Sequence, residues 1–145
     1  MRPIYRKAAF IVIYRRDKSK ILYLLLKRKL HWKGWEFPKG GVKKNEAVLK
    51  AVQREIKEET GQKPLNIKKY PIQGKYKYLK KLEDRSNIIG QTYQLFSAQI
   101  KNKKIKIDKL EHSSYKWLEF KKTVKLLTYS NQRKCLRIIH RKLNS

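Results

Sequence analysis

The sequence predicts an α/β domain in which short strands combine with two amphipathic helices. Three observations lead to this fold class: a pair of short apolar stretches near the start, a capped amphipathic helix in the middle, and a second amphipathic helix at the end. With 145 residues the chain has the length of one domain, so we expect residues 1–145 to form a single unit.

Two apolar stretches near the start predict a pair of strands. Residues 8–14 and 21–26 are short and apolar, and the polar run 15–20 between them predicts a loop of about six residues. Charges lie on both sides of the first stretch, and no small-residue cleavage site follows it. We therefore interpret it as a first strand and not as a signal peptide.

The middle of the chain predicts a helix over residues 46–60. Apolar side chains recur there about every four positions and form one stripe, made of Val48, Ala51, Val52 and Ile56. Asn45 is expected to be the N-cap, and Gly61 can adopt the left-handed conformation that commonly follows a helix. Both ends of this helix are thus marked in the sequence.

The second half of the chain predicts two further strands and a terminal helix. The strands are expected at residues 91–100 and around 115–118, whereas residues 67–82 show no clear pattern. Residues 130–143 form an amphipathic pattern whose outer side is basic. Glycine and proline concentrate at residues 34–41, which predicts one tight loop that leads into the middle helix.

The composition excludes several classes of protein. The longest apolar run is the seven-residue stretch 8–14, whereas a membrane-spanning helix needs about 20 residues, so we expect no membrane partner. A single cysteine, Cys135, cannot form an intrachain disulfide. This favours a reducing compartment, and we expect the protein to be cytoplasmic.

The charge balance indicates a polyanionic partner. Lys and Arg total 39 against 11 Asp and Glu, which gives a net charge of +28. Such an excess attracts nucleic acid or a phosphorylated ligand through counterion release and long-range electrostatics. A genomic bias toward Lys and Ile codons is the alternative, although the eight Glu and six Asn residues fit it poorly.

Four of the 11 acidic residues lie close together in or near the middle helix: Glu46, Glu55, Glu58 and Glu59. The last three follow an i, i+3, i+4 spacing, which places them on one side of a helix where like charges repel. A divalent cation would relieve this repulsion, and oxygen ligands suit Mg²⁺ or Mn²⁺. The alternative is a solvated helix face whose carboxylates pair with Lys50, Arg54 and Lys57.

Residues 40–61, GGVKKNEAVLKAVQREIKEETG, resemble the signature of the Nudix hydrolases. The matching residues, at the spacing of the family pattern, are Gly40, Glu46, Arg54, Glu55, Ile56, Glu58, Glu59 and Gly61. The one departure is Gln62, where the family pattern has a bulky aliphatic residue. Residues 35–39 resemble the lead-in of Nudix enzymes that act on dinucleoside polyphosphates or RNA 5′ ends, and segments 115–118 and 126–132 are similar to asymmetric diadenosine tetraphosphate hydrolases.

The resemblance implies an α/β/α sandwich with a mixed sheet, in which the signature forms a loop, a helix and a loop. It also implies that water attacks phosphorus in a nucleoside diphosphate linked to a further group. Glu55, Glu58 and Glu59 would hold Mg²⁺ or Mn²⁺, and the backbone carbonyl of Lys39 or Gly40 would add a ligand. The metal ion would lower the pKa of a bound water molecule.

The family pattern suggests further roles for individual residues. Arg54 would orient Glu55, and Glu46 would support the start of the helix through a salt bridge. The proton acceptor would be Glu55, Glu58 or a carboxylate outside the signature, for which Glu111 is the candidate because related enzymes often carry an acidic ligand before this strand. His112 beside it would contact a phosphate or be a solvated surface group.

Substrate contacts are expected from lysines and tyrosines. Lys39 and Lys43, together with Lys44, flank the glycine-rich loop and can bind phosphates as point charges. A nucleobase could stack on Tyr76 or Tyr78, or on Tyr93, although each of these rings could equally serve packing between strands.

Three functions follow from these observations. The first is a Mg²⁺-dependent pyrophosphohydrolase that acts on a dinucleoside polyphosphate such as diadenosine tetraphosphate. The second keeps this chemistry but acts on RNA 5′ ends, with the basic surface holding the transcript. The third is a Nudix-fold module that binds ribosomal or other structured RNA, with catalysis secondary or absent.

Overall fold

The computed structural model describes residues 3–29, 33–78, 87–107 and 109–145. Within them, seven strands form one mixed sheet: β1 (Ile4–Asp17), β2 (Lys20–Arg28), β3 (Gly34–Glu36), β4 (Lys39–Gly41), β5 (Asn66–Lys77), β6 (Ile88–Gln99) and β7 (His112–Leu118). The strand order is β3-β2-β1-β6-β5, with β4 paired to β1 and β7 paired to β2. Strands β1 and β6 run parallel at the centre of the sheet.

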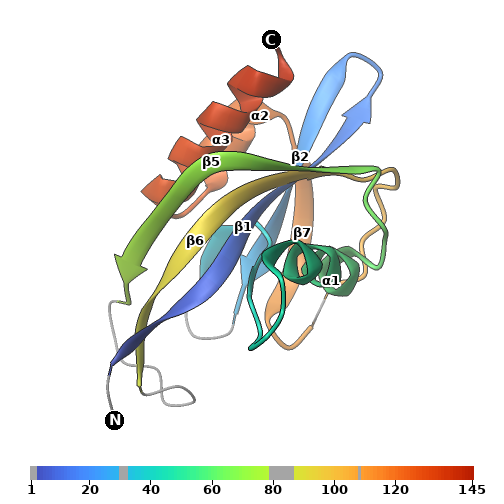
Figure 1. The fold of residues 1–145 in the computed structure, drawn as a ribbon. Coiled ribbons are helices and arrows are strands. Elements are labelled where there is room, and N and C mark those ends of the chain that lie inside the picture. Colours follow the sequence, from blue (N-terminus) through green and yellow to red (C-terminus); the bar gives the residue numbers. More distant parts are fainter. Residues whose placement is uncertain (1–2, 30–32, 79–86, 108) are drawn as a thin grey trace.

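Three helices cover the two faces of this sheet. Helix α1 (Val48–Thr60) lies on one face, and α2 (Phe120–Leu126) and α3 (Ser130–Leu143) lie on the other, as Figure 1 shows. The α/β/α sandwich implied by the family resemblance is confirmed. No helix in the described part of the chain is long and apolar enough to cross a membrane.

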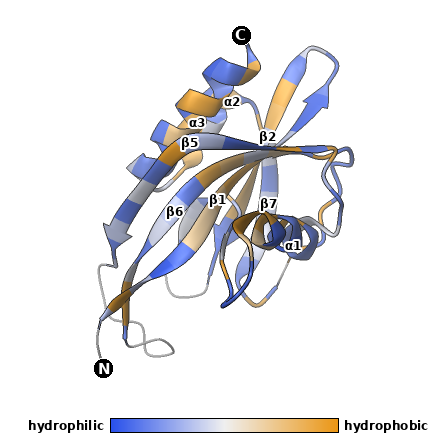
Figure 2. Cartoon of the chain, viewed as in Figure 1, coloured by the Kyte–Doolittle hydropathy of each residue, from blue (hydrophilic) through white to orange (hydrophobic). Residues whose placement is uncertain are grey.

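Strand β1 supplies side chains to both halves of the core. Phe10 and Val12 pack with Leu136 and Ile139 of α3. The alternate residues of β1, among them Ile11 and Ile13, pack on the other face with Val52 and Ile56 of α1. Because successive side chains of a strand point to opposite faces, an unbroken apolar run is buried only when both faces are covered. In Figure 2 apolar residues, in orange, accordingly lie along the central strands and on α3.

The connection between β1 and β2 corrects the sequence prediction. The expected six-residue loop at 15–20 is wrong, because Asp17 pairs with Lys20 and only two residues form the turn. Lys18 in this turn has a φ of 58°. The backbone ladder continues through Arg15 and Arg16, since hydrogen bonding between main chains does not require apolar side chains.

Helix α1 also begins later than predicted. It starts at Val48, Ala47 occupies the N-cap position without a side-chain hydrogen bond, and Asn45 has a φ of 64°. Asn45 is therefore not the N-cap and instead lies in a tight turn before the helix. The other end agrees with the prediction, because Gly61 follows Thr60 in the left-handed conformation and its N–H donates to the carbonyl of Lys57.

The remaining elements agree with the sequence to different degrees. Helix α3 has the predicted bounds, and the strands expected at 91–100 and 115–118 correspond to β6 and to the longer β7. Strand β5 occupies much of the unassigned segment 67–82, whose residues beyond 78 lie outside the described ranges. Its register shifts between Lys69 and Gln73, which obscures any alternating pattern. Helix α2 was not predicted.

We predict that Gly61→Ala lowers the free energy of unfolding by about 1 kcal/mol, because a side chain disfavours the left-handed region that this position occupies at φ 75°. Urea unfolding of the two proteins measures the difference. Gly61→Asn serves as the control, since Asn tolerates this conformation better and should cost less. Equal stability of all three proteins would contradict the prediction.

Candidate active site

The guanidinium of Arg54 joins α1 to the loop that precedes it. Its Nε and Nη2 donate to the two carboxylate oxygens of Glu46, both at 2.9 Å, and Nη2 also donates to the carbonyl of Gly41 at 2.9 Å. Glu46 additionally accepts the backbone N–H of Lys43. These hydrogen bonds, first of all that from Arg54, lower the pKa of Glu46 to about 2. The salt bridge expected for Glu46 is therefore present.

Arg54 also orients the carboxylates of α1. Its Nη1 donates to Oε1 of Glu55 at 2.8 Å and lies 3.4 Å from both oxygens of Glu58. Glu55 packs directly against Gly40 of β4, where a Cβ atom would overlap its carboxyl group. Gly40 thus lets the backbone approach the helix closely.

Glu55 occupies the meeting point of several acidic groups. Burial raises its pKa to about 7, the hydrogen bond from Arg54 opposes this rise, and the charges of Glu58 and Glu111 add to it. Glu58 is largely exposed, whereas the side chain of Glu111 is 35% exposed and lies 3.7 Å from Nη1 of Arg28. The fold thus brings the outside carboxylate close to the signature.

Glu59 points into the protein, toward the first residue of β7. It is buried, and its Oε2 lies 3.5 Å from Nδ1 of His112. The Nε2 of the same histidine lies 3.1 Å from Oε2 of Glu36 in β3. His112 is 2% exposed, so the prediction of a solvated surface histidine is wrong. Candidate ligand atoms of Glu59, Glu111 and His112 lie within 4.8 Å of one another.

Glu36 forms the centre of a second, buried charge network. It is 1% exposed, and besides His112 it contacts Nη1 of Arg28 at 3.1 Å and Nζ of Lys39 at 3.4 Å. Burial alone would raise its pKa, but Lys39, His112 and Arg28 lower it to about 2. The sequence analysis missed Glu36 and Arg28. The available signal was an acidic residue inside the lead-in at 35–39, in a chain with few acidic residues.

The predicted substrate residues are divided between the site and its surroundings. The side chain of Lys39 is only 9% exposed, and its Nζ reaches the hydroxyl of Tyr76 at 3.5 Å. Tyr76 packs edge-on against Tyr78, whereas Tyr93 stacks on Phe10 in the core and thus serves packing.

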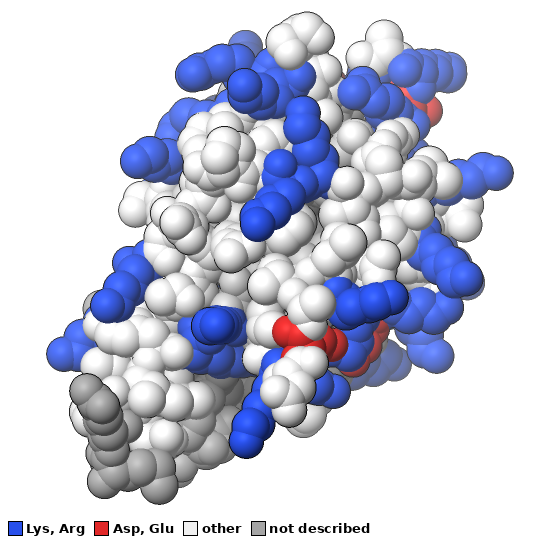
Figure 3. All heavy atoms as spheres, viewed as in Figure 1, with Lys and Arg blue, Asp and Glu red and all other residues white. Residues whose placement is uncertain are grey.

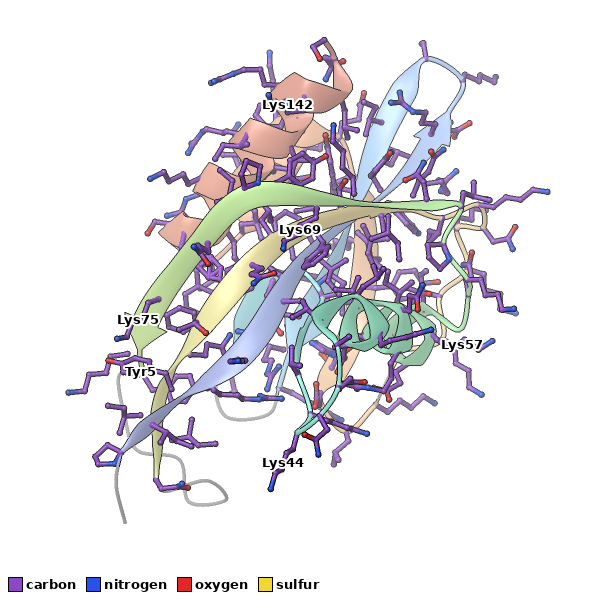
Figure 4. All side chains as sticks on the ribbon, in the orientation of Figure 1. Tyr5, Lys44, Lys57, Lys69, Lys75 and Lys142 are labelled. Atoms are coloured by element: carbon purple, nitrogen blue, oxygen red, sulfur yellow. The ribbon has the colours of Figure 1, made fainter. Side chains whose placement is uncertain are left out.

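The lysines within the signature itself are exposed to solvent. Lys43 and Lys44 are exposed, and Figure 4 shows Lys44 and Lys57 directed away from the molecule. The sequence analysis also missed Tyr129, which lies near this site, since the charges of Glu36 and Arg28 act on its hydroxyl.

The donor set fits a divalent cation that prefers hard oxygen ligands. Glu59, Glu111 and His112 bring candidate ligand atoms within 4.8 Å of one another, and burial, followed by the charges of Glu58 and Glu111, raises the pKa of nearby Glu55. The backbone of Gly40 adjoins the carboxyl group of Glu55. Carboxylate and carbonyl oxygens are the ligands typical of Mg²⁺ and Mn²⁺.

Comparison with known families finds a match over most of the chain. The family model described as the NUDIX domain matches residues 4–137. Among solved structures, the C. elegans Ap4A hydrolase in a binary complex superposes with a TM-score of 0.78 and is 26% identical, with 96% of this chain and 98% of that chain covered.

Two relatives are named RNA pyrophosphohydrolase. That of a Nitratiruptor species is 29% identical over 126 residues, which cover 83% of this chain and 81% of the relative. That of Haemophilus influenzae is 30% identical over 127 residues, which cover 80% of this chain. The match spans 63% of the Haemophilus protein, less than two thirds of its length.

We predict that Glu36→Gln lowers the free energy of unfolding at neutral pH by about 3 kcal/mol, because it removes the carboxylate that buried Arg28 and Lys39 share. Urea unfolding measures the change, and exposed Glu58→Gln is the control, expected to alter stability by less than about 0.5 kcal/mol.

The loss of stability in Glu36→Gln is expected to depend on pH. The pKa of Glu36 is about 2 in the folded protein and 4.5 when unperturbed, so its stabilisation is complete above pH 4.5 and is lost as the pH falls toward 2. The stability difference between the wild type and Glu36→Gln should therefore shrink as the pH falls below 4.5. A constant difference over this interval would contradict the assignment.

Proposed function

Because this chain belongs to the Nudix family and is a hydrolase of phosphoanhydride bonds, we propose that it is a Mg²⁺-dependent pyrophosphohydrolase that acts on the 5′-polyphosphate end of RNA. The observations that support the chemistry are the close contact of Glu55 with Gly40 and the cluster of Glu59, Glu111 and His112, whose candidate ligand atoms lie within 4.8 Å of one another. The choice of RNA depends on the charge outside this site and on the similarity to the two RNA pyrophosphohydrolases.

In this proposal three carboxylates of the signature bind the metal ion, and Arg54 positions two of them. Glu55, Glu58 and Glu59 would hold Mg²⁺ together with the backbone carbonyl of Gly40, with Glu59 on the buried side next to His112. When bound there, the ion would supply positive charge opposite the phosphates and would activate a water molecule. Arg54 is a positioning residue, because it holds Glu55 and Glu58 while Glu46 and the Gly41 carbonyl hold its own guanidinium.

The reaction also requires a proton acceptor and contacts to the phosphates. Glu111 would take the first task, since its charge acts on Glu55 from the turn before β7. Lys43 is exposed in the loop that begins the signature and could bind a phosphate oxygen directly. Lys39 is bound to Glu36, and its amino group also reaches Tyr76, so it can act on a substrate that contacts this tyrosine.

The distribution of charge supports an RNA substrate. The net charge is +28, and most lysines lie outside the signature, many of them on β5, on the loop before β7 and on the two helices α2 and α3. Figure 3 shows Lys and Arg spread over the visible face, while acidic atoms gather mainly near α1. A small nucleotide needs only a few of these cations, whereas a transcript presents one phosphate per nucleotide.

A dinucleoside polyphosphate remains the second candidate substrate, which the similarity to the C. elegans Ap4A hydrolase favours. Tyr76 lies beside Lys39 and packs edge-on against Tyr78, and either ring could stack on a nucleobase. The third hypothesis, an RNA-binding module without catalysis, is disfavoured by the complete carboxylate set in a chain with only 11 acidic residues.

We predict that Glu58→Gln lowers kcat by at least about a hundredfold, because it removes a ligand to the metal ion that stabilises the transition state. Steady-state hydrolysis of triphosphorylated RNA with Mg²⁺ measures the loss, and circular dichroism checks that the fold is retained. Glu119→Gln, an exposed carboxylate at the start of α2, is the matched control and should keep wild-type turnover. Retained metal-dependent hydrolysis in Glu58→Gln would refute the mechanism.

We predict that triphosphorylated RNA has a higher kcat/KM than diadenosine tetraphosphate at low salt and that its KM rises steeply with salt, because many lysine–phosphate contacts are screened. Competition between the two substrates at several salt concentrations, with products identified by mass, measures both effects. If the protein prefers diadenosine tetraphosphate at every salt concentration, the prediction is wrong and the dinucleoside polyphosphate becomes the favoured substrate.

A further inference from the structure

A groove of about 830 Å³ lies at the C-terminal end of α1. One wall is formed by residues 60–62, which end the helix, and the other by the loop 102–107 together with Lys109. This loop precedes β7 and belongs to none of the helices or strands. The groove is distinct from the carboxylate cluster but adjoins it, because Glu59 precedes one wall and Glu111 follows the other.

Gln62 holds the two walls of the groove together. Its Nε2 donates to the carbonyls of Asn102 and Lys104 at 2.9 and 3.1 Å, and its Oε1 accepts the N–H of Asn102 at 3.1 Å. Gln62 is the one position at which the sequence departs from the Nudix signature. An aliphatic side chain at this position could form none of these hydrogen bonds.

Three further contacts fix the course of the loop. The indole N–H of Trp117 donates to the carbonyl of Lys103 at 2.7 Å, and the N–H of Lys106 donates to the carbonyl of Thr60 at 3.4 Å. Ile105 is buried against the side of the core that includes α1. The backbone of the loop is therefore ordered before any ligand binds, which reduces the entropic cost of binding.

The ordered loop presents a dense set of cations. Five lysines lie between residues 101 and 109, and all five are exposed: Lys101, Lys103, Lys104, Lys106 and Lys109. No lysine of this loop takes part in an ion pair formed between described residues. Figure 3 shows basic side chains along the edge of the molecule where α1 ends.

We propose that this groove binds the phosphodiester backbone of the RNA just downstream of the 5′ end that the active site hydrolyses; the assignment rests on the proposed RNA substrate. A strand whose 5′ phosphates lie beside Glu55 and Glu111 reaches the groove by passing the end of α1. Exposed lysines on an ordered loop along a groove suit a flexible chain with regularly spaced charges. The binding is independent of base sequence, since it uses phosphates alone.

A purely structural role for the lysines predicts a different result. The carbonyl end of a helix attracts cations, so lysines near Thr60 also stabilise α1. However, Lys57 already lies in the last turn, and one or two charges suffice for this effect. Stability and RNA affinity, measured on the same variant, therefore separate the two roles.

The test compares two triple variants with equal loss of charge. The groove variant is Lys103→Gln, Lys104→Gln, Lys106→Gln. The control variant is Lys121→Gln, Lys122→Gln, Lys125→Gln on α2, which covers the opposite face of the sheet and whose lysines are also exposed. The probe is a fluorescent single-stranded RNA of about 20 nucleotides with a 5′-hydroxyl end, followed by anisotropy from about 50 to 200 mM salt.

We expect the groove variant to bind this RNA at least about tenfold more weakly than the wild type at low salt. Its slope of log affinity against log salt should be shallower by about 2, because each phosphate contact on a single strand contributes about 0.7. The control variant should change the affinity less than the groove variant. For hydrolysis, the ratio of kcat/KM for triphosphorylated RNA to that for diadenosine tetraphosphate should fall in the groove variant only.

Equal RNA affinity and salt slope in the two triple variants would overturn the proposal, and so would a groove variant that loses stability but not affinity. Polyglutamate that displaces the fluorescent RNA probe more strongly than unlabelled RNA does would also overturn the proposal, because the groove would then bind an acidic protein. The 5′-hydroxyl probe cannot be hydrolysed, so groove binding is measured separately from activity. Wild-type protein that binds the probe through the groove but fails to hydrolyse triphosphorylated RNA would refute the proposed function alone.

Discussion

The bidentate ion pair between Arg54 and Glu46 is the constraint on which the arrangement of the candidate active site depends. It connects the loop before α1 to the second turn of the helix, and the same guanidinium binds the Gly41 carbonyl, Glu55 and Glu58. One planar cation with several fixed donors can hold these acceptors at once, which a lysine cannot do. Two carboxylates that repel each other are thereby kept together.

A second network of buried charges joins the sheet to the helix. Glu36 of β3 binds Arg28 of β2, Lys39 of β4 and His112 of β7, and His112 in turn lies against Glu59 of α1. Buried charges are stable only when they are paired, so each strand must adopt its correct register for this network to form. The network therefore couples the sheet edge to the inner side of the signature helix.

The two signs of charge are used in different places. Acidic residues are few, and most of those that the structure describes lie in the two networks around α1, whereas the lysines cover the surface. Negative side chains gathered at one point suit cation binding, and a positive exterior raises the local concentration of polyanions. The groove at the end of α1 lies where these two regions meet, with Glu59 next to one wall and ordered lysines on the other.

Sequence alone determined the features that depend on neighbours within one or two helical turns. The spacing of Glu55, Glu58 and Glu59, the left-handed Gly61 and the bounds of α3 all follow from local periodicity and conformational preference. Only the tertiary structure decided that Glu36, Arg28 and His112 contact one another. It also decided that Asn45 does not occupy the N-cap position and that Gln62 forms hydrogen bonds to a lysine-rich loop. The contacts of Glu36 and Gln62 join residues that are far apart in the chain, so they depend on strand register and core packing. At Asn45 the tertiary structure outweighs the local preference for an N-cap.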